Sequence, residues 1–275
     1  MKMKKRSLII AATVFGFFLL NSNAIAGYLD TGWGNITEYD GYKGGSSNPT
    51  YNTWWNTTNE DEEVEPGAAT GQQWDLEGFF LSDGTDSGVN DNELAMVGGF
   101  NFETGQSGIS SGDIFIDTDM NNGYYEYVMD LDFDTLEYSV YKSTQGNEIE
   151  YNKPNKAGPG VTKNTPWTYK SGGVAVNDFQ NIALNYLDNT ELNSLYGGVG
   201  GTLQGNWHNV ATVNLSFLGG GTDFMVLNTM QCGNDVMFGE GTSTAAVPEP
   251  ATIFLLGSGL LGLFGYRKKF WKSKN

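Results

Sequence analysis

The sequence predicts an all-β protein: a β-sandwich or jelly-roll-like body, flanked by an N-terminal signal-peptide helix and a single C-terminal transmembrane helix. Glycine makes up 38 of the 275 residues, about twice its usual share, and aromatic residues make up 13%. Many glycines together with many aromatics favour short strands joined by tight turns over helical bundles. In addition, apolar and polar residues alternate along several segments, as they do in strands with one buried face.

Residues 1–26 have the three parts of a secretory signal peptide. Leu8–Leu20 is an uncharged, largely apolar run that is too short to span a bilayer comfortably. A basic region precedes it: Lys2, Lys4, Lys5 and Arg6. Small residues then form a signal-peptidase site at Ala24 and Ala26, which makes Gly27 the expected first residue of the mature protein. The expected partners at this end are the Sec translocon and signal peptidase.

The clearest strand signal lies at residues 124–134, where the odd-numbered positions are aromatic or aliphatic and acidic residues share the other face. We expect a strand with one solvent-exposed face there. Residues 136–140 repeat the pattern after a short turn, which predicts an antiparallel hairpin. Further strands are expected at these segments: Trp74–Leu81, Leu94–Phe102, Asp113–Asp117, Val210–Phe217 and Asp223–Thr229.

Two connecting segments receive other predictions. Residues 142–172 hold five of the six lysines of the body together with prolines, a composition that predicts a long loop. In Asn177–Leu195 the apolar residues are spaced as on one face of a helix, so a helix is expected there.

The charge of the body argues against one class of partner. Residues 27–247 hold six basic and 31 acidic residues, a formal charge of −25. Such a surface repels phosphate backbones, so we expect no nucleic-acid partner. It would attract Ca²⁺ or a cationic surface, although solubility alone accounts for the charge equally well.

The best candidate for chemistry in the body is an acidic turn. Asp117, Asp119 and Asn121 alternate and Gly123 follows, which is the spacing of oxygen ligands at the start of a Ca²⁺-binding loop. The sixth position of such a loop is Asn122 here rather than glycine, and the twelfth is valine rather than glutamate. Calcium as a ligand and a plain acidic β-turn therefore both stay open.

Nucleophilic chemistry has less support. His208 is the only histidine in the chain, so any Ser–His or Cys–His arrangement depends on it, and its Gly- and Asn-rich surroundings predict a structural role. Gly108–Gly112 fits G-x-S-x-G, but a strand rather than a helix is expected after its serine. Cys232 is the only cysteine, which excludes an intrachain disulfide. A small buried hydrophobe and an intermolecular or reactive thiol both stay open for it.

The C-terminal end has three consecutive features. Val247, Pro248, Glu249 and Pro250 come first, and the two prolines favour an extended chain. Ala251–Tyr266 then runs for sixteen residues without a charge, which gives a helix of roughly 24 Å, workable for a thin bilayer. A basic cluster follows and is expected to stay in the cytoplasm: Arg267, Lys268 and Lys269.

This order of features resembles the PEP-CTERM sorting domain, and Pro248, Glu249 and Pro250 match the signature of that family directly. The resemblance implies that an exosortase, a membrane cysteine protease, recognises the tail and removes the anchor. It also implies a destination at the surface, or in the exopolysaccharide matrix, of a Gram-negative bacterium. Gly112–Asp117 and Gly123–Tyr127 further resemble segments in the bodies of proteins with this tail, which implies no activity.

Together these features predict three parts: a signal peptide at 1–26, a β-rich exported body at 27–244 and the sorting tail at 245–275. The chain is expected to cross the inner membrane, to be anchored transiently by its C-terminal helix, and to reach the cell surface or the extracellular space. We expect a non-enzymatic surface or matrix protein associated with exopolysaccharide. Two alternatives stay open: a calcium-assisted, lectin-like module that stacks exposed Trp and Tyr on sugars, and a secreted polysaccharide hydrolase.

Overall fold

The computed structural model describes residues 27–38, 69–84, 91–120, 125–144, 148–151, 165–201 and 203–244. Strands dominate these residues, so the predicted all-β class is confirmed. None of the helices within these ranges is long and apolar enough to cross a membrane. The predicted signal-peptide helix and transmembrane helix lie outside the described residues.

One sheet contains five strands in the order β1–β3–β4–β13–β12, and each pairs antiparallel with its neighbour. The strands are β1 (Trp33–Asn35), β3 (Leu76–Ser82), β4 (Glu93–Gly98), β13 (Asn209–Asn214) and β12 (Asn185–Leu187). Three of them, β3, β4 and β13, confirm strands that the sequence predicts.

A second sheet contains eight strands in the order β10–β7–β6–β5–β14–β15–β2, with β11 paired to β7. The strands are β2 (Thr37–Glu38), β5 (Ile114–Asp117), β6 (Tyr127–Asp132), β7 (Glu137–Lys142), β10 (Val174–Ala175), β11 (Ile182–Ala183), β14 (Asp223–Thr229) and β15 (Val236–Thr242). The predicted hairpin is confirmed as β6–β7. Because β5, β6 and β7 pair in succession and β14 returns to lie beside β5, this sheet has Greek-key order.

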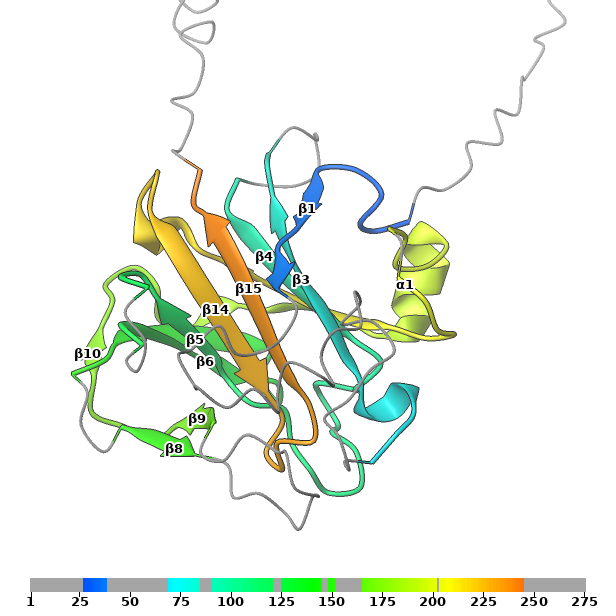
Figure 1. The fold of residues 1–275 in the computed structure, drawn as a ribbon, viewed down its shortest axis with the longest axis horizontal. Helices are drawn as coiled ribbons and strands as arrows, with labels where there is room; N and C mark the ends of the chain where they lie inside the picture. Colours follow the sequence, from blue (N-terminus) through cyan, green and yellow to red (C-terminus); the bar gives the residue numbers. More distant parts are fainter. Residues whose placement is uncertain are drawn as a thin grey trace, which may run out of the picture.

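The two sheets face each other across one hydrophobic core. Phe79 and Met96 contribute to it from the first sheet, and Ile116, Met129 and Phe224 contribute from the second; all five are fully buried. Figure 1 shows β14 and β15 running alongside β3 and β4 in this arrangement. The two-layer body is therefore the sandwich that the alternating pattern predicts.

Both outer faces of the sandwich are also partly covered. On the five-stranded sheet, Phe80 and Val97 pack with Leu192 of helix α1 (Asn189–Tyr196). On the eight-stranded sheet, Phe115 and Val128 are buried beneath a two-stranded sheet of β8 (Ile149–Tyr151) and β9 (Pro166–Tyr169). Figure 1 shows α1 and the β8–β9 pair on opposite sides of the molecule. The expectation of a solvent-exposed face at 124–134 is therefore wrong at Val128, because β8–β9 covers that position.

The predictions for the two connecting segments are also wrong. Residues 142–172, expected as a long loop, contain β8 and β9, which pair with each other. Asn177–Leu195, expected as one helix, contains β11 and β12 before α1 begins at Asn189. Asp188 sets that start: its side chain accepts from the Glu191 N–H, and the Glu191 side chain accepts from the Asp188 N–H. This capping box begins a helix only after β12 has paired with β13.

The sandwich has two distinct ends. At one end Leu76, the first residue of β3, donates its N–H to Oδ2 of Asp235 at 2.5 Å, immediately before β15. At the other end Gly241 of β15 lies against Leu81 near the end of β3. β3 and β15 therefore run in the same direction in facing sheets, about 20 Å from end to end at ~3.3 Å per residue. Since β15 leads toward residues 245–275, the tail leaves from the end opposite Leu76.

A buried carboxylate connects three strands within the second sheet and its cover. Asp113 is 3% exposed; its Oδ1 accepts from the N–H of Leu131 at 2.8 Å, and its Oδ2 accepts from the N–H of Tyr169 at 2.7 Å and from the hydroxyl of Thr168 at 3.0 Å. Burial, and then the nearby Asp130 carboxylate, raises the pKa of Asp113 to about 7.

We predict that Asp113 makes the body less stable as the pH rises from about 4 to 7. Its carboxyl binds a proton more tightly in the folded state than in the unfolded one, where its pKa is about 3.9, so the contribution is complete below pH ~4 and is lost through pH ~7. The difference between the pKa values of Asp113 in the folded and unfolded states corresponds to roughly 4 kcal/mol. Thermal unfolding followed by circular dichroism at several pH values measures it.

The comparison variant is Asp113→Asn, which cannot ionise. It should melt lower than wild type at pH 4.5, because one amide oxygen cannot accept all three hydrogen bonds, but the difference should shrink toward pH 8. Asp178→Asn removes an exposed carboxylate and serves as the charge control. If the melting temperature of Asp113→Asn falls with rising pH as much as that of wild type, Asp113 is not the cause of the pH dependence.

Candidate functional site

The predicted metal-binding turn forms at the end of β5. Asp117 is buried, and its Oδ1 accepts the backbone N–H of Asp119 at 3.0 Å and that of Met120 at 2.8 Å. Met120 has a positive φ of 54°, which turns the chain back toward β6. The structure therefore brings Asp117 and Asp119 together as the sequence predicts, whereas Asn121 lies outside the described residues.

Glu126 is a third carboxylate at this turn that the loop pattern did not indicate. Its Oε2 accepts the N–H of Thr118 at 2.7 Å, and oxygens of Asp117, Asp119 and Glu126 all lie within 4.8 Å of one another. Burial, and to a lesser degree the Glu126 and Asp119 charges, raises the pKa of Asp117. The register of the β5–β6 hairpin indicates the position of Glu126. Ile116 pairs with Tyr127, so the residues next to them in the turn, Asp117 and Glu126, face each other.

Three carboxylate oxygens at this separation can act as ligands for a hard divalent cation such as Ca²⁺, which would also relieve their mutual repulsion. The same hydrogen bonds equally define a plain acidic turn. Calcium at this turn stays a prediction.

His208 has the structural role that its surroundings predict. Its Nε2 lies 3.3 Å from Oε2 of Glu77 and 2.6 Å from the carbonyl oxygen of Gln204. Both side chains of the pair are buried, and Gln72 also donates to the Glu77 carboxylate. The backbone N–H of His208 donates to Oδ1 of Asn189 at 3.2 Å. His208 thus holds the 203–209 segment against β3 and α1. Cys232 is half-buried, and burial raises the pKa of its thiol.

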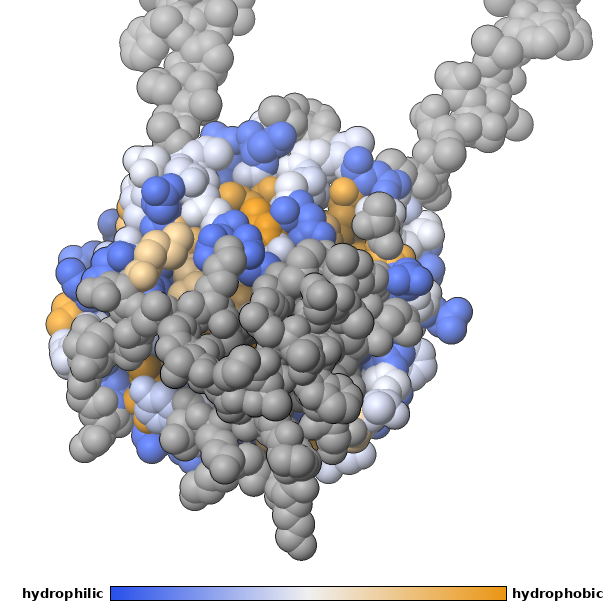
Figure 2. Space-filling view, viewed as in Figure 1, coloured by the Kyte–Doolittle hydropathy of each residue, from blue (hydrophilic) through white to orange (hydrophobic). Residues whose placement is uncertain are grey.

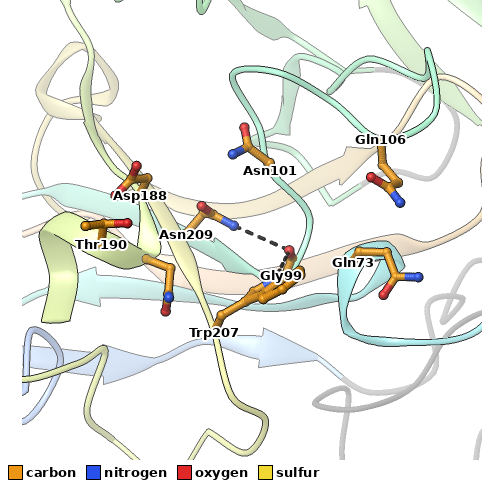
Figure 3. A pocket seen from close by; sticks show the side chains of 9 residues that line it. Gln73, Gly99, Asn101, Gln106, Asp188, Thr190, Trp207 and Asn209 are labelled. Atoms are coloured by element: carbon orange, nitrogen blue, oxygen red, sulfur yellow. Dashed lines mark hydrogen bonds between the residues drawn. The ribbon is translucent and has the colours of Figure 1, made fainter.

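Beside this pair lies a pocket of about 240 Å³ where β4, β13 and the start of α1 meet (Figure 3). The indole N–H of Trp207 donates to the Gly99 carbonyl at 2.8 Å, and the Asn209 amide donates to the same carbonyl at 3.3 Å. The Tyr186 hydroxyl in turn donates to Oδ1 of Asn209 at 3.2 Å. Trp207 is therefore held at its edge while 46% of it stays exposed.

The rest of the pocket wall is polar and comes from separate segments of the chain: Gln73, Asn101, Gln106, Asp188, Asn189 and Thr190. Gly99 also lines the pocket and has no room for a side chain, because a Cβ there would lie 2.0 Å from the Gln72 carbonyl oxygen. Sequence reasoning did not find this pocket, although it did anticipate a role for exposed aromatic side chains.

The predicted sorting residues are placed as follows. Gly27 is the first described residue, and its nitrogen donates to Oδ2 of Asp30 at 2.6 Å. The other members of the predicted processing and anchoring sites lie outside the described residues: Ala24, Ala26, Val247, Pro248, Glu249, Pro250, Arg267, Lys268 and Lys269.

Comparison with known families bears on these tail residues. The chain matches the family model of the PEP-CTERM protein-sorting motif at residues 246–269. Comparisons with curated proteins and with solved structures find no match. The body and the motif together define an all-β protein with a C-terminal sorting signal. Residues 246–269 thus carry the PEP-CTERM sorting motif that the sequence predicts. The motif implies export, a membrane-anchored sorting signal and processing by an exosortase, a membrane protease.

We predict that Ca²⁺ stabilises the wild-type body more than Mg²⁺ does. Extracellular sites commonly bind Ca²⁺ at roughly 0.1–1 mM, and a tenfold excess over Kd adds about 1.4 kcal/mol, or roughly 3–5 °C in melting temperature for a domain of this size. Glu126→Gln and Asp119→Asn should abolish the difference. Asp132→Asn removes an exposed charge outside the turn and should keep it. If Ca²⁺ raises the melting temperature of wild type and all three variants equally, the turn does not bind Ca²⁺ and is only a structural feature.

A second prediction concerns His208. Replacing it with alanine leaves the buried Glu77 carboxylate with one partner fewer, and removing a partner from a buried polar group costs about 1–3 kcal/mol. Urea denaturation of His208→Ala should show a loss of that order. Asn206→Ala, an exposed position in the same segment, is the matched control. If both variants lose equally little free energy of unfolding, the His208–Glu77 pair does not stabilise the fold.

Proposed function

We propose that this chain is an exported protein that an exosortase sorts to the cell surface or extracellular matrix, where its body acts without catalysis and associates with exopolysaccharide. The observation that carries the proposal is the PEP-CTERM motif at residues 246–269, which follows directly on the last strand of the sandwich, β15. A folded body joined to a sorting signal by a short segment is the arrangement that such a route requires.

The contacts of Gly27 support cleavage after Ala26. A Cβ on Gly27 would lie 2.2 Å from the Cα of Gly200, so this position accepts only glycine. Asp30 accepts from the Gly27 nitrogen at 2.6 Å and from the Gly201 N–H at 2.7 Å. Cleavage would convert the Gly27 nitrogen into a positively charged ammonium beside the Asp30 carboxylate, an ion pair in a body that has few cations.

The surface of the body suits an aqueous or matrix environment. On the uncovered part of the face in Figure 2, hydrophobic areas are small and separated by hydrophilic ones. The formal charge of −25 over residues 27–247 keeps such bodies apart in solution. The non-catalytic interpretation is supported by the buried position of His208, whose Nε2 contacts Glu77 and the Gln204 carbonyl oxygen.

The test is the mass of the protein at its destination. Intact-mass measurement of surface-released protein should give a chain that begins at Gly27 and lacks Ala251–Tyr266. In a host without exosortase, or in the Pro248→Ala/Glu249→Ala variant, the protein should stay in the membrane fraction with Arg267 attached. Ser258→Ala, within the span, should be processed normally. If the released protein retains Arg267, the tail is an ordinary membrane anchor and is not removed by an exosortase.

Association with polysaccharide is tested separately. The released protein should co-sediment with extracellular polysaccharide from its host and leave the length of the polymer unchanged. Shortening of the polymer, abolished by substitution of one carboxylate, would instead support the hydrolase alternative.

A further inference from the structure

We propose that the Trp207 pocket binds a neutral sugar unit of a polysaccharide, with the indole as the stacking surface and the surrounding side-chain amides as hydrogen-bonding groups. This inference deepens the proposed function and rests on it, because it gives the exported body a ligand and a place to bind it.

The first argument is that Trp207 is both exposed and fixed. An exposed tryptophan normally loses side-chain freedom when a ligand stacks on it, and that loss opposes binding. Here the Gly99 carbonyl accepts from the indole N–H at 2.8 Å and also from the Asn209 amide at 3.3 Å. The bond uses the edge of the ring, so its face stays available for the C–H face of a pyranose ring. Figure 3 shows Trp207 beside Gly99 and Asn209.

The second argument is that the pocket offers uncommitted hydrogen-bonding groups around this ring. Within the part of the chain that the structure describes, the side chains of Gln73, Gln106 and Thr190 have no hydrogen-bond partner, and neither has Nδ2 of Asn101. Each of the two glutamine side chains presents both a donor and an acceptor. Sugar hydroxyls also donate and accept at once, so paired groups of this kind suit them.

Asn189 and Asn209 have the opposite role. Asn189 Oδ1 accepts from the His208 N–H at 3.2 Å, and the Asn209 amide is committed to the Gly98–Phe100 carbonyls. They position the wall instead of offering groups to a ligand. The pocket therefore combines a rigid frame with free amides, as preorganised binding sites do.

The third argument identifies the ligand as uncharged. Among the described residues that line the pocket there is no lysine or arginine, and the charged side chain is the Asp188 carboxylate. The −25 body adds a repulsive field. Uronic acids and phosphate- or sulfate-bearing sugars are therefore disfavoured. A volume of about 240 Å³ lies below the ~300–1,000 Å³ of clefts for drug-sized molecules, which suits a single sugar unit.

The fourth argument is the position of the pocket. Gly99 follows β4, and Gln73 precedes β3, at the end of the sandwich where Leu76 meets Asp235. The tail leaves from the opposite end, about 20 Å away along β3. When the chain is tethered by its C-terminal segment, the pocket is held on the side away from the attachment point, where a polymer can reach it.

The experiment is a calorimetric titration of the full-length protein with neutral oligosaccharides of glucose and of N-acetylglucosamine, and with oligogalacturonate as the anionic comparison. Wild type should bind at least one neutral series more tightly than oligogalacturonate. Trp207→Ala should weaken that binding by roughly tenfold or more, as loss of an aromatic anchor does. Gln106→Ala should weaken it by about two- to tenfold, the effect of one hydrogen bond.

Two controls keep the result interpretable. Tyr151→Ala removes an aromatic side chain that is 47% exposed, against 46% for Trp207, but lies on β8 outside the pocket; it should bind as wild type does. Gln106 makes no side-chain hydrogen bond, so Gln106→Ala should keep the wild-type melting temperature and provides a test even if Trp207→Ala does not fold.

Three results would contradict sugar binding at the Trp207 pocket: no binding of either neutral series by folded wild type, unchanged binding in Gln106→Ala and Trp207→Ala, or a preference for oligogalacturonate. These results are distinguishable from failure of the proposed route. A correctly processed protein that binds no sugar overturns the pocket alone, whereas a protein that binds sugar but retains Arg267 at the surface overturns the exosortase route alone.

Discussion

The shortage of cations in an acidic body is the constraint on which the rest of this structure depends. Residues 27–247 hold six basic and 31 acidic residues, and a carboxylate buried without compensation costs several kcal/mol. Backbone N–H groups offset part of that cost. They donate to Asp113 from Leu131 and Tyr169, and to Asp235 from Leu76 and Val236. By contrast, the Lys170–Glu150 pair is nearly half-exposed on both sides and contributes little to stability.

Through these hydrogen bonds, the buried carboxylates act first as structural groups that connect segments of the fold. Asp113 joins β5 and β6 to the β8–β9 cover, Asp235 joins the two sheets across the core, and Asp117 shapes the turn after β5. An acidic residue that closes a turn by accepting N–H groups looks the same in sequence as the first ligand of a metal loop. That similarity is why the spacing of Asp117 and Asp119 supports two interpretations, and why the position of Glu126 adds information that spacing does not contain.

The strands that could be predicted are those that carry their own pattern. β6 follows an alternating pattern, and β5 and β14 are short apolar runs next to an aspartate. β15 has neither signal, because Gly239 and Gly241 stand where the sheets approach closely: a Cβ on Gly239 would lie 3.2 Å from Cβ of Phe79. β12 was missed because its pairing with β13 is non-local, although the capping box of Asp188 and Glu191 could have shown that a helix begins only at Asn189. The Trp207 pocket draws on segments more than a hundred residues apart, so no local pattern reveals it.

In our proposal, the two ends of the sandwich have different tasks, attachment at one end and sugar binding at the other. One end continues from β15 to the sorting motif, and the other carries a shallow polar pocket whose frame is built from Gly99, Asn209 and His208. A site with one aromatic surface and a few amides gives modest affinity for a single sugar unit, because each hydrogen bond replaces one to water. On a polymer the same unit recurs along the chain, so a protein that dissociates meets the next unit at high local concentration. If the pocket binds sugar as we propose, weak binding at one end is sufficient for retention in a polysaccharide, and it would leave a protein without its tail able to move through that material.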